Sequence, residues 1–138
     1  MILFLPSDSP QGATLSCEHP LPGLWNLMMN AITRIDDRFC TGPQISVEDM
    51  DAIKAAGFKS VICNRPDNEG GPTQPDHKLL EAAANRVGLK FAYLPVVSGN
   101  ISDADVADFK NLINELPAPV LAFCRSGARS KTLYERAR

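Results

Sequence analysis

Cys124 opens a short segment, Cys-Arg-Ser-Gly-Ala-Arg-Ser over residues 124–130, in which a thiol stands among two arginines, two serines and a glycine. The apolar run 120–123 before it predicts a buried strand, and residues 131–138 after it have a helical pattern. A strand, a glycine turn and a helix N-terminus direct backbone N–H groups at one point, which suits an oxyanion or a thiolate. Such surroundings lower the pKa of a thiol, so the sequence predicts that Cys124 is an ionised nucleophile.

The other residues of this segment are candidates for binding a substrate. Arg129 carries a planar, permanently charged guanidinium that can hold two oxygens at once, so we predict a catalytic role for it beside Cys124. The candidate substrate-binding residues of the segment are Arg125, Ser126, Gly127, Ala128 and Ser130. The alternative interpretation of Cys124 is a buried structural cysteine, which is common among free thiols.

Length and composition limit the classes of protein to consider. The chain has 138 residues, a formal net charge of −2, and four cysteines without a Cys-x-x-Cys pair or a zinc-ligand spacing. These features predict one domain, no nucleic-acid binding, no metal and no cofactor. Scattered free cysteines suit a reducing cytoplasm, and the apolar run 1–5 is too short for a signal peptide or a membrane span. We therefore expect a cytoplasmic protein without a membrane partner.

From residue 32 onward, segments with strand-like and helix-like patterns alternate. Residues 1–31 predict an irregular N-terminal extension, with a short helix at 24–29 as an alternative. The predicted domain, residues 32–138, begins with one edge-like strand that ends in a turn at 41–43. It continues with a helix at 46–57, a strand at 59–64, a helix at 75–88, a strand at 91–97, a helix at 102–116, and the strand and helix around Cys124.

This alternation predicts an α/β fold in which a mainly parallel sheet is covered by helices on both faces, a three-layer arrangement. In such sheets ligands bind beyond the carboxyl ends of the strands. The loops at 64–69 and 98–100 and the loop after Cys124 all follow predicted strands, so we expect them to converge on one site. The candidate substrate-binding residues in the first of these loops are Asn64, Arg65 and Asp67.

Four stretches of the chain resemble the phosphatase-like domain of beta-lactamase hydrolase-like proteins. They are residues 39–49 (FCTGPQISVED), 57–69 (GFKSVICNRPDNE), 94–97 (LPVV) and 124–130 (CRSGARS). The resemblance covers roughly residues 32–134 and implies a fold similar to that of the protein tyrosine and dual-specificity phosphatases. It implies that Cys124 attacks phosphorus and that Arg129 holds the phosphoryl oxygens. It also implies a fused or partner hydrolase domain in the parent protein.

Two features of the chain differ from those phosphatases. Four residues, rather than five, separate Cys124 from Arg129, a spacing that resembles the rhodanese-type sulfurtransferases, whose cysteine carries a sulfane sulfur as a persulfide. Residues 98–100 (Ser-Gly-Asn) stand where phosphatases place the aspartate that protonates the leaving oxygen. The nearest carboxylates, Asp103 and Asp105, are therefore the candidate catalytic acids, although the first turn of a helix favours acidic residues by itself.

Three residues, one at the end of the 59–64 strand and two in the loop that follows it, have more than one interpretation. Asp67 and Glu69 could donate a proton, orient Arg65 or Arg129 by bidentate pairing, or belong to a solvated loop. Cys63 could be a resolving thiol for Cys124 or a core cysteine.

Three functions follow from these observations, in this order of preference. The first is a phosphatase-like hydrolase that forms a phosphocysteine intermediate. The second is a sulfurtransferase that forms a cysteine persulfide, and the third is a non-catalytic module that binds oxyanions. The corresponding partners are a small oxyanion or phosphorylated substrate, or a sulfane-sulfur donor.

Overall fold

The computed structural model describes residues 32–138, so the predicted N-terminal extension lies outside the described residues. The elements are β1 (Thr33–Asp36), β2 (Phe39–Gly42), the 3₁₀ helix η3 (Val47–Asp49), α2 (Met50–Ala55), β3 (Ser60–Cys63), α3 (His77–Arg86), β4 (Lys90–Tyr93), α4 (Asp103–Glu115), β5 (Val120–Phe123) and α5 (Ala128–Ala137).

The strands form one five-stranded sheet in the order β1-β2-β5-β3-β4. Strands β2, β5, β3 and β4 run parallel, and β1 pairs antiparallel with β2. The last residue of β5, Phe123, is in register with Gly42 on one side and Cys63 on the other. Because β5 is the central strand, Cys124 leaves the sheet at the middle of its carboxyl edge.

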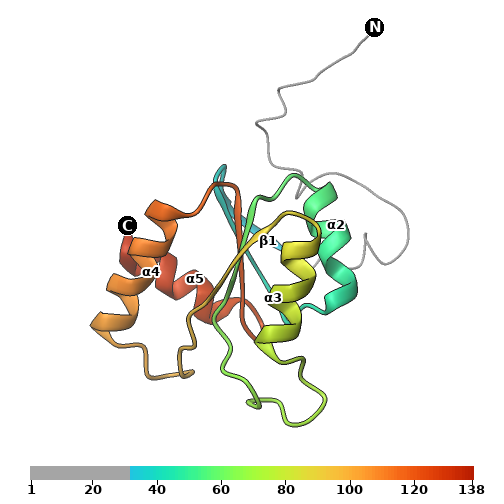
Figure 1. The fold of residues 1–138 in the computed structure, drawn as a ribbon. Coiled ribbons are helices and arrows are strands. Elements are labelled where there is room, and N and C mark those ends of the chain that lie inside the picture. Colours follow the sequence, from blue (N-terminus) through green and yellow to red (C-terminus); the bar gives the residue numbers. More distant parts are fainter. Residues whose placement is uncertain (1–31) are drawn as a thin grey trace, which may run out of the picture.

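The side chains of β5 point alternately to the two faces of the sheet, as in any strand. Leu121 and Phe123 pack with buried residues of α2 and α3, whereas Val120 and Ala122 pack with those of α4 and α5. Figure 1 shows α2 and α3 on one side of the sheet and α4 and α5 on the other. The predicted α/β fold with three layers is confirmed.

Several helix ends lie where the sequence predicts them. Ser102 is the N-cap of α4, and it forms a capping box in which its Oγ accepts the Asp105 N–H at 3.1 Å while Asp105 Oδ2 accepts the Ser102 N–H at 3.0 Å. Ser46 and Asp49 form a capping box before η3. Gly88 follows the end of α3 with a φ of +86°, in the left-handed region that glycine adopts readily.

The prediction of a single edge-like strand near the start of the domain was wrong. The segment is a hairpin in which β1 forms the edge and β2 is paired on both sides. Thr41 and Gly42, expected in a turn, are strand residues and are buried. Small residues fit there because β2 is enclosed on both faces, and a side chain on Gly42 would lie only 3.4 Å from Ile32.

Helix α3 also begins later than predicted. Asp76 is its N-cap and accepts a hydrogen bond from the Lys78 N–H at 2.8 Å, so Pro75 precedes the helix instead of lying in its first turn. With this start, Leu80 lies in the core and Leu79 is 60% exposed.

Within residues 32–138, every helix is too short or too polar to cross a lipid bilayer.

We predict that Phe109→Ala lowers the free energy of unfolding by about 3–5 kcal/mol. Phe109 is the buried residue of α4, and its ring meets the ring of Phe39 edge-on at a centroid distance of 5.8 Å. Truncation of this side chain therefore leaves a cavity. Leu79→Ala is the matched control, because this exposed helical leucine should change stability by no more than about 0.5 kcal/mol. Urea unfolding of the two variants measures the difference, and equal losses would contradict the assignment of the core.

Candidate active site

Cys124 is the first residue after β5 and lies in a tight loop at the carboxyl edge of the sheet. The N–H of Gly127 donates a hydrogen bond to its Sγ at 3.0 Å, and the residue is only 1% exposed. The Cys124 N–H in turn donates to the Gly42 carbonyl at 3.3 Å. The loop is therefore curled around the sulfur and tied to the end of β2.

The electrostatic surroundings of Cys124 favour its thiolate form. Burial by itself would raise the pKa of this thiol. Backbone N–H groups directed at the sulfur have the opposite effect and outweigh burial, so the pKa lies below its ordinary value of 9.0; these N–H groups belong to Ser130, Ser126, Gly127 and Arg129. Several of them belong to the first turn of α5, where the helix dipole also favours negative charge.

Two constraints require glycine at position 127. Its φ of +98° lies in the left-handed region, where a side chain is strained. A methyl group there would also lie 3.3 Å from the carbonyl oxygen of Gly42. The loop can therefore pack its backbone directly against β2, which allows only four residues to separate Cys124 from Arg129.

Arg129 is held from behind by the loop that follows β3. Its Nη1 and Nη2 donate to the two carboxylate oxygens of Glu69, each at 3.1 Å, and Nη1 also donates to the Val96 carbonyl at 2.8 Å. The side chain is 7% exposed, and its Nε is buried without a hydrogen-bond partner among the described residues. Glu69 and Val96 thus fix the orientation of the guanidinium.

Glu69 bridges two arginines. Besides Arg129, it accepts a hydrogen bond from Arg65 Nε at 3.0 Å, and Arg65 Nη1 donates to Gln44 Oε1 at 3.0 Å. Burial would raise the pKa of Glu69, but its hydrogen bonds to Arg129 and Arg65 outweigh this and lower it. Of the alternatives for Glu69, the structure therefore places this side chain as the partner that orients both arginines.

Asn64 and Ser130 are buried and join the strand edge to α5. The Ser130 hydroxyl donates to Asn64 Oδ1 at 2.8 Å, and Asn64 Nδ2 donates to the Leu94 carbonyl at 3.0 Å. The Asn64 carbonyl also accepts the Val96 N–H at 3.1 Å. These contacts hold the loops after β3 and β4 against α5. Neither Asn64 nor Ser130 lines the two hollows described next.

Two adjoining hollows lie at this edge of the sheet. The first, about 320 Å³, is lined by Ser98, Gly99, Ile101, Cys124, Ser126, Ala128, Arg129 and Thr132. The second, about 560 Å³, is lined by Arg65, Glu69, Gly70, Ser98, Arg125 and Arg129. The loops after β3, β4 and β5 thus converge, as predicted from their positions after strands, and Figure 1 shows the first two, together with the start of α5, at the lower end of the sheet.

The three aspartates considered from the sequence line neither hollow. Asp103 is exposed and forms an ion pair with Arg136 at 3.0 Å, and Asp105 belongs to the capping box of α4. Asp67 accepts hydrogen bonds from the N–H of His77 at 2.9 Å and lies 2.6 Å from its Nδ1. All three side chains are engaged at helix N-termini.

Asp67, Asp76 and His77 bring potential metal-ligating atoms within 4.8 Å of one another. These atoms already serve the start of α3, where Asp76 is the N-cap and Asp67 pairs with His77. The His77 ring also stacks on Tyr93 at 3.7 Å, and the Tyr93 hydroxyl accepts the Asp67 N–H at 2.9 Å. The cluster therefore anchors the loop that carries Glu69.

Cys63 has the surroundings of a core cysteine and not those of an activated thiol. Its Sγ donates to the Arg65 carbonyl at 3.4 Å, and burial raises its pKa to about 12. Cys40 is a buried cysteine of β2, and Cys17 lies outside the described residues.

Sequence reasoning missed several contributors to the site. Gln44 supports Arg65, Gly42 receives the Cys124 loop, and Thr132 lines the first hollow. Only the Gly42 contact has a sequence signal, a glycine in an otherwise side-chain-bearing strand; the others depend on how distant segments pack.

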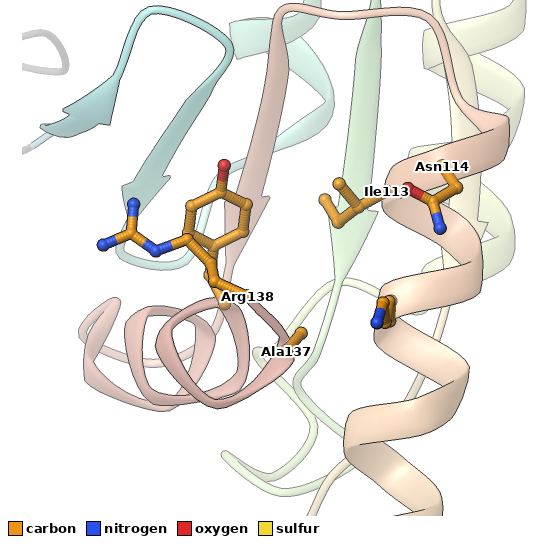
Figure 2. Close-up of a pocket in the computed structure, with 6 residues that line it drawn as sticks. Ile113, Asn114, Ala137 and Arg138 are labelled. Atoms are coloured by element: carbon orange, nitrogen blue, oxygen red, sulfur yellow. The ribbon is translucent and has the colours of Figure 1, made fainter.

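An apolar groove of about 230 Å³ lies away from this site, between the ends of α4 and α5. Figure 2 shows Ala137 and Arg138 across the groove from Ile113 and Asn114. The groove also includes Tyr134, which stacks on Phe39 at the opposite end of β2 from Cys124. It holds no thiol, so we locate the chemistry at Cys124.

We predict that limiting iodoacetamide at neutral pH alkylates Cys124 before Cys63 or Cys40. The lowered pKa of Cys124 should place the midpoint of its rate–pH profile below 9.0, whereas Cys63, with a pKa of about 12, should react only after unfolding. Peptide mass mapping across a pH series measures both. Earlier labelling of Cys63, or a Cys124 midpoint at or above 9.0, would refute the activation of this thiol.

The comparisons with known proteins agree with this geometry. Residues 31–137 match the family model for the phosphatase-like domain of beta-lactamase hydrolase-like proteins. A beta-lactamase hydrolase-like protein of Agrobacterium fabrum is 37% identical over 101 residues, which make up 73% of this chain and 23% of that protein. The chain therefore spans about a quarter of the length of this curated relative.

Solved structures place the fold among those of tyrosine-phosphatase-like proteins. A candidate phosphatase of Neisseria meningitidis is 36% identical, with a TM-score of 0.70 over 75% of this chain and 73% of that chain. The structure of Tk-PTP, at 18% identity, shares the fold alone, with a TM-score of 0.61 over 77% of this chain and 69% of that chain. Because the family model spans the sheet and the Cys124 loop, the chain belongs to the family of phosphatase-like domains of beta-lactamase hydrolase-like proteins.

Proposed function

We propose that this phosphatase-like domain is a cysteine-dependent hydrolase of phosphomonoesters. The observation that carries the proposal is the Cys124 sulfur, surrounded by backbone N–H groups that lower its pKa, in one hollow with Arg129, whose Nε has no protein partner among the described residues. A thiolate and a ring of hydrogen-bond donors are what a nucleophilic attack on an oxyanion requires.

The reaction has two displacements at phosphorus. The Cys124 thiolate forms an S–P bond while the bond from phosphorus to the leaving oxygen breaks; the leaving oxygen keeps the electron pair of that bond and takes a proton from solvent water. A second water then forms an O–P bond and releases a proton to solvent, the S–P bond breaks with its electron pair on sulfur, and phosphate and the thiolate are released. The loop N–H groups and Arg129 stabilise the negative charge on the non-bridging oxygens in both steps.

The proposed reaction also depends on how the leaving oxygen is protonated. Among residues 32–138, no carboxylate lines the hollow that contains Cys124; Ser98, Ser126 and Thr132 supply hydroxyl groups there. Without a carboxylic acid beside the leaving group, the site favours phosphoesters whose leaving oxygen is already a weak base, such as aryl phosphates. Asp103 and Asp105 lie in the first turn of α4 outside the hollow, so either could act as the acid only after that turn moves toward Cys124.

A sulfurtransferase is the second candidate, because four residues separate Cys124 from Arg129 and no described residue that lines the hollow is an acid. In that reaction the thiolate attacks the sulfane sulfur of thiosulfate. An S–S bond to Cys124 forms, the S–S bond of the donor breaks, and sulfite leaves with the electron pair, so no proton donor is needed.

One experiment separates these functions. We expect the chain to hydrolyse p-nitrophenyl phosphate, to carry one phosphoryl group on Cys124 after rapid acid quenching, and to lose both properties in Cys124→Ser. Cys63→Ala is the control and should keep turnover, because Cys63 lies in the core behind the site. A mass gain of one sulfur on Cys124 after thiosulfate, without phosphate release, would favour the sulfurtransferase. Anion binding without either covalent product would favour a non-catalytic module.

We predict that Arg129→Lys lowers kcat/KM for p-nitrophenyl phosphate by about 10²–10³ while the protein stays folded. A lysine supplies a point charge and cannot keep the two-pronged contact to Glu69 while presenting an N–H to the substrate. Arg136→Lys on the same helix is the matched control, because Arg136 is exposed and pairs with Asp103 outside both hollows. Equal activity of the two variants would remove Arg129 from the reaction.

A further inference from the structure

We propose that the hollow beside the Cys124 pocket is a second anion-binding subsite, and that the substrate is a small phosphomonoester carrying a second anionic group. The substrate part of this inference rests on the proposed function. The subsite itself rests on the shape and charge of the second hollow.

The two hollows are joined. Ser98 and Arg129 line both of them, so a ligand whose reacting group lies over Cys124 can extend past Arg129 into the second hollow. Their volumes, about 320 and 560 Å³, lie in the range typical of small-ligand pockets. This size favours a small molecule over an extended phosphopeptide.

The second hollow is strongly positive. Three of its lining residues are arginines and one is a glutamate, so three positive charges and one negative charge leave a net charge of +2. The chain as a whole has a formal net charge of −2. The positive charge is therefore concentrated locally, next to the sulfur, and a negative group is the complementary ligand.

The three arginines differ in how much of their hydrogen-bonding capacity is used within the protein. Arg65 and Arg129 share Glu69, and Arg65 also donates to Gln44, so much of their hydrogen-bonding capacity is used within the protein. Arg125 is exposed, and its guanidinium has no hydrogen-bond or ion-pair partner in the described part of the chain. Arg125 directly follows Cys124, so its fork is free to bind an anion beside the nucleophile.

Gly70 makes room for the Arg65 guanidinium. A methyl group at position 70 would come within 2.5 Å of Arg65 Nη2 and 3.1 Å of Gln74 Oε1. Arg65 cannot easily move away, because it is 8% exposed and held by Glu69 and Gln44. The absence of a side chain at Gly70 therefore lets the Arg65 guanidinium lie against the loop backbone, where it lines this hollow.

A series of matched phosphonates tests the subsite without requiring turnover. We would measure by calorimetry the binding of alkyl monophosphonates and of α,ω-alkylene bisphosphonates of equal chain length to the Cys124→Ser variant. We expect at least one bisphosphonate to bind about tenfold or more tightly than its monophosphonate, the gain of one charge-assisted contact. This advantage should fall as NaCl is raised, since the contact is near the surface.

Arg125→Met in the Cys124→Ser background should remove most of the bisphosphonate advantage. Lys131→Met is the matched control, because Lys131 is an exposed cation of α5 outside both hollows and its loss should keep the advantage. Equal binding of monophosphonates and bisphosphonates at every chain length would overturn the subsite. An advantage retained in Arg125→Met, or tighter binding of an acidic phosphopeptide than of any bisphosphonate, would also overturn it.

Turnover by the unmodified chain separates the two proposals. Hydrolysis of p-nitrophenyl phosphate without any bisphosphonate advantage would refute the subsite and leave the reaction standing. A bisphosphonate advantage in a chain that hydrolyses no phosphomonoester would keep the anion subsite and refute both the reaction and the substrate class inferred from it.

Discussion

The ion pair between Glu69 and Arg129 is the interaction on which the arrangement of the site depends. Arg129 comes from the first turn of α5 and Glu69 from the loop after β3, yet both Glu69 oxygens accept hydrogen bonds from this one guanidinium. A buried arginine needs such a partner, because an unpaired charge away from water is costly. The partner also fixes the rotation of the guanidinium plane, in the hollow that Arg129 shares with Cys124.

The same logic explains why the loop after β3 is so well tied down. Asp67, His77 and Tyr93 connect its first part to α3 and β4 through hydrogen bonds and ring stacking. Gln74 connects its second part, since its Nε2 donates to the Pro66 carbonyl at 2.8 Å. A loop that carries a charge-orienting group has to be rigid to position it, and here the rigidity comes from polar contacts rather than from burial of apolar side chains.

The nucleophile is controlled by backbone rather than by side chains. Four N–H groups outweigh the cost of burying the Cys124 sulfur. For Cys63, which is buried on the neighbouring strand, a single backbone hydrogen bond with Arg65 does not outweigh burial, and the pKa is raised to about 12. The difference arises because β5 leads into a glycine turn and a helix N-terminus, while β3 leads into an open loop. The close contact of Gly127 with Gly42 makes that tight turn possible.

The sequence alone determined the elements whose signals are local. The alternation of strand-like and helix-like segments predicted the three-layer fold. Ser102 predicted the start of α4, and the segment from Cys124 to Arg129 predicted the position of the nucleophile, because each of these signals depends on neighbours in the chain.

Tertiary structure decided which charged side chains meet. Asp103 and Asp105 lie near the expected position of an acid in the sequence, but Asp105 belongs to a capping box and Asp103 to an exposed ion pair. Glu69, which is 60 residues from Arg129 in the chain, forms a hydrogen bond with it. The β1–β2 hairpin was likewise undetermined by its own residues, since the burial of Thr41 and Gly42 follows from β5 pairing beside them. Such long-range pairings have no periodicity within a short window of sequence, so only the packing of the whole sheet could select them.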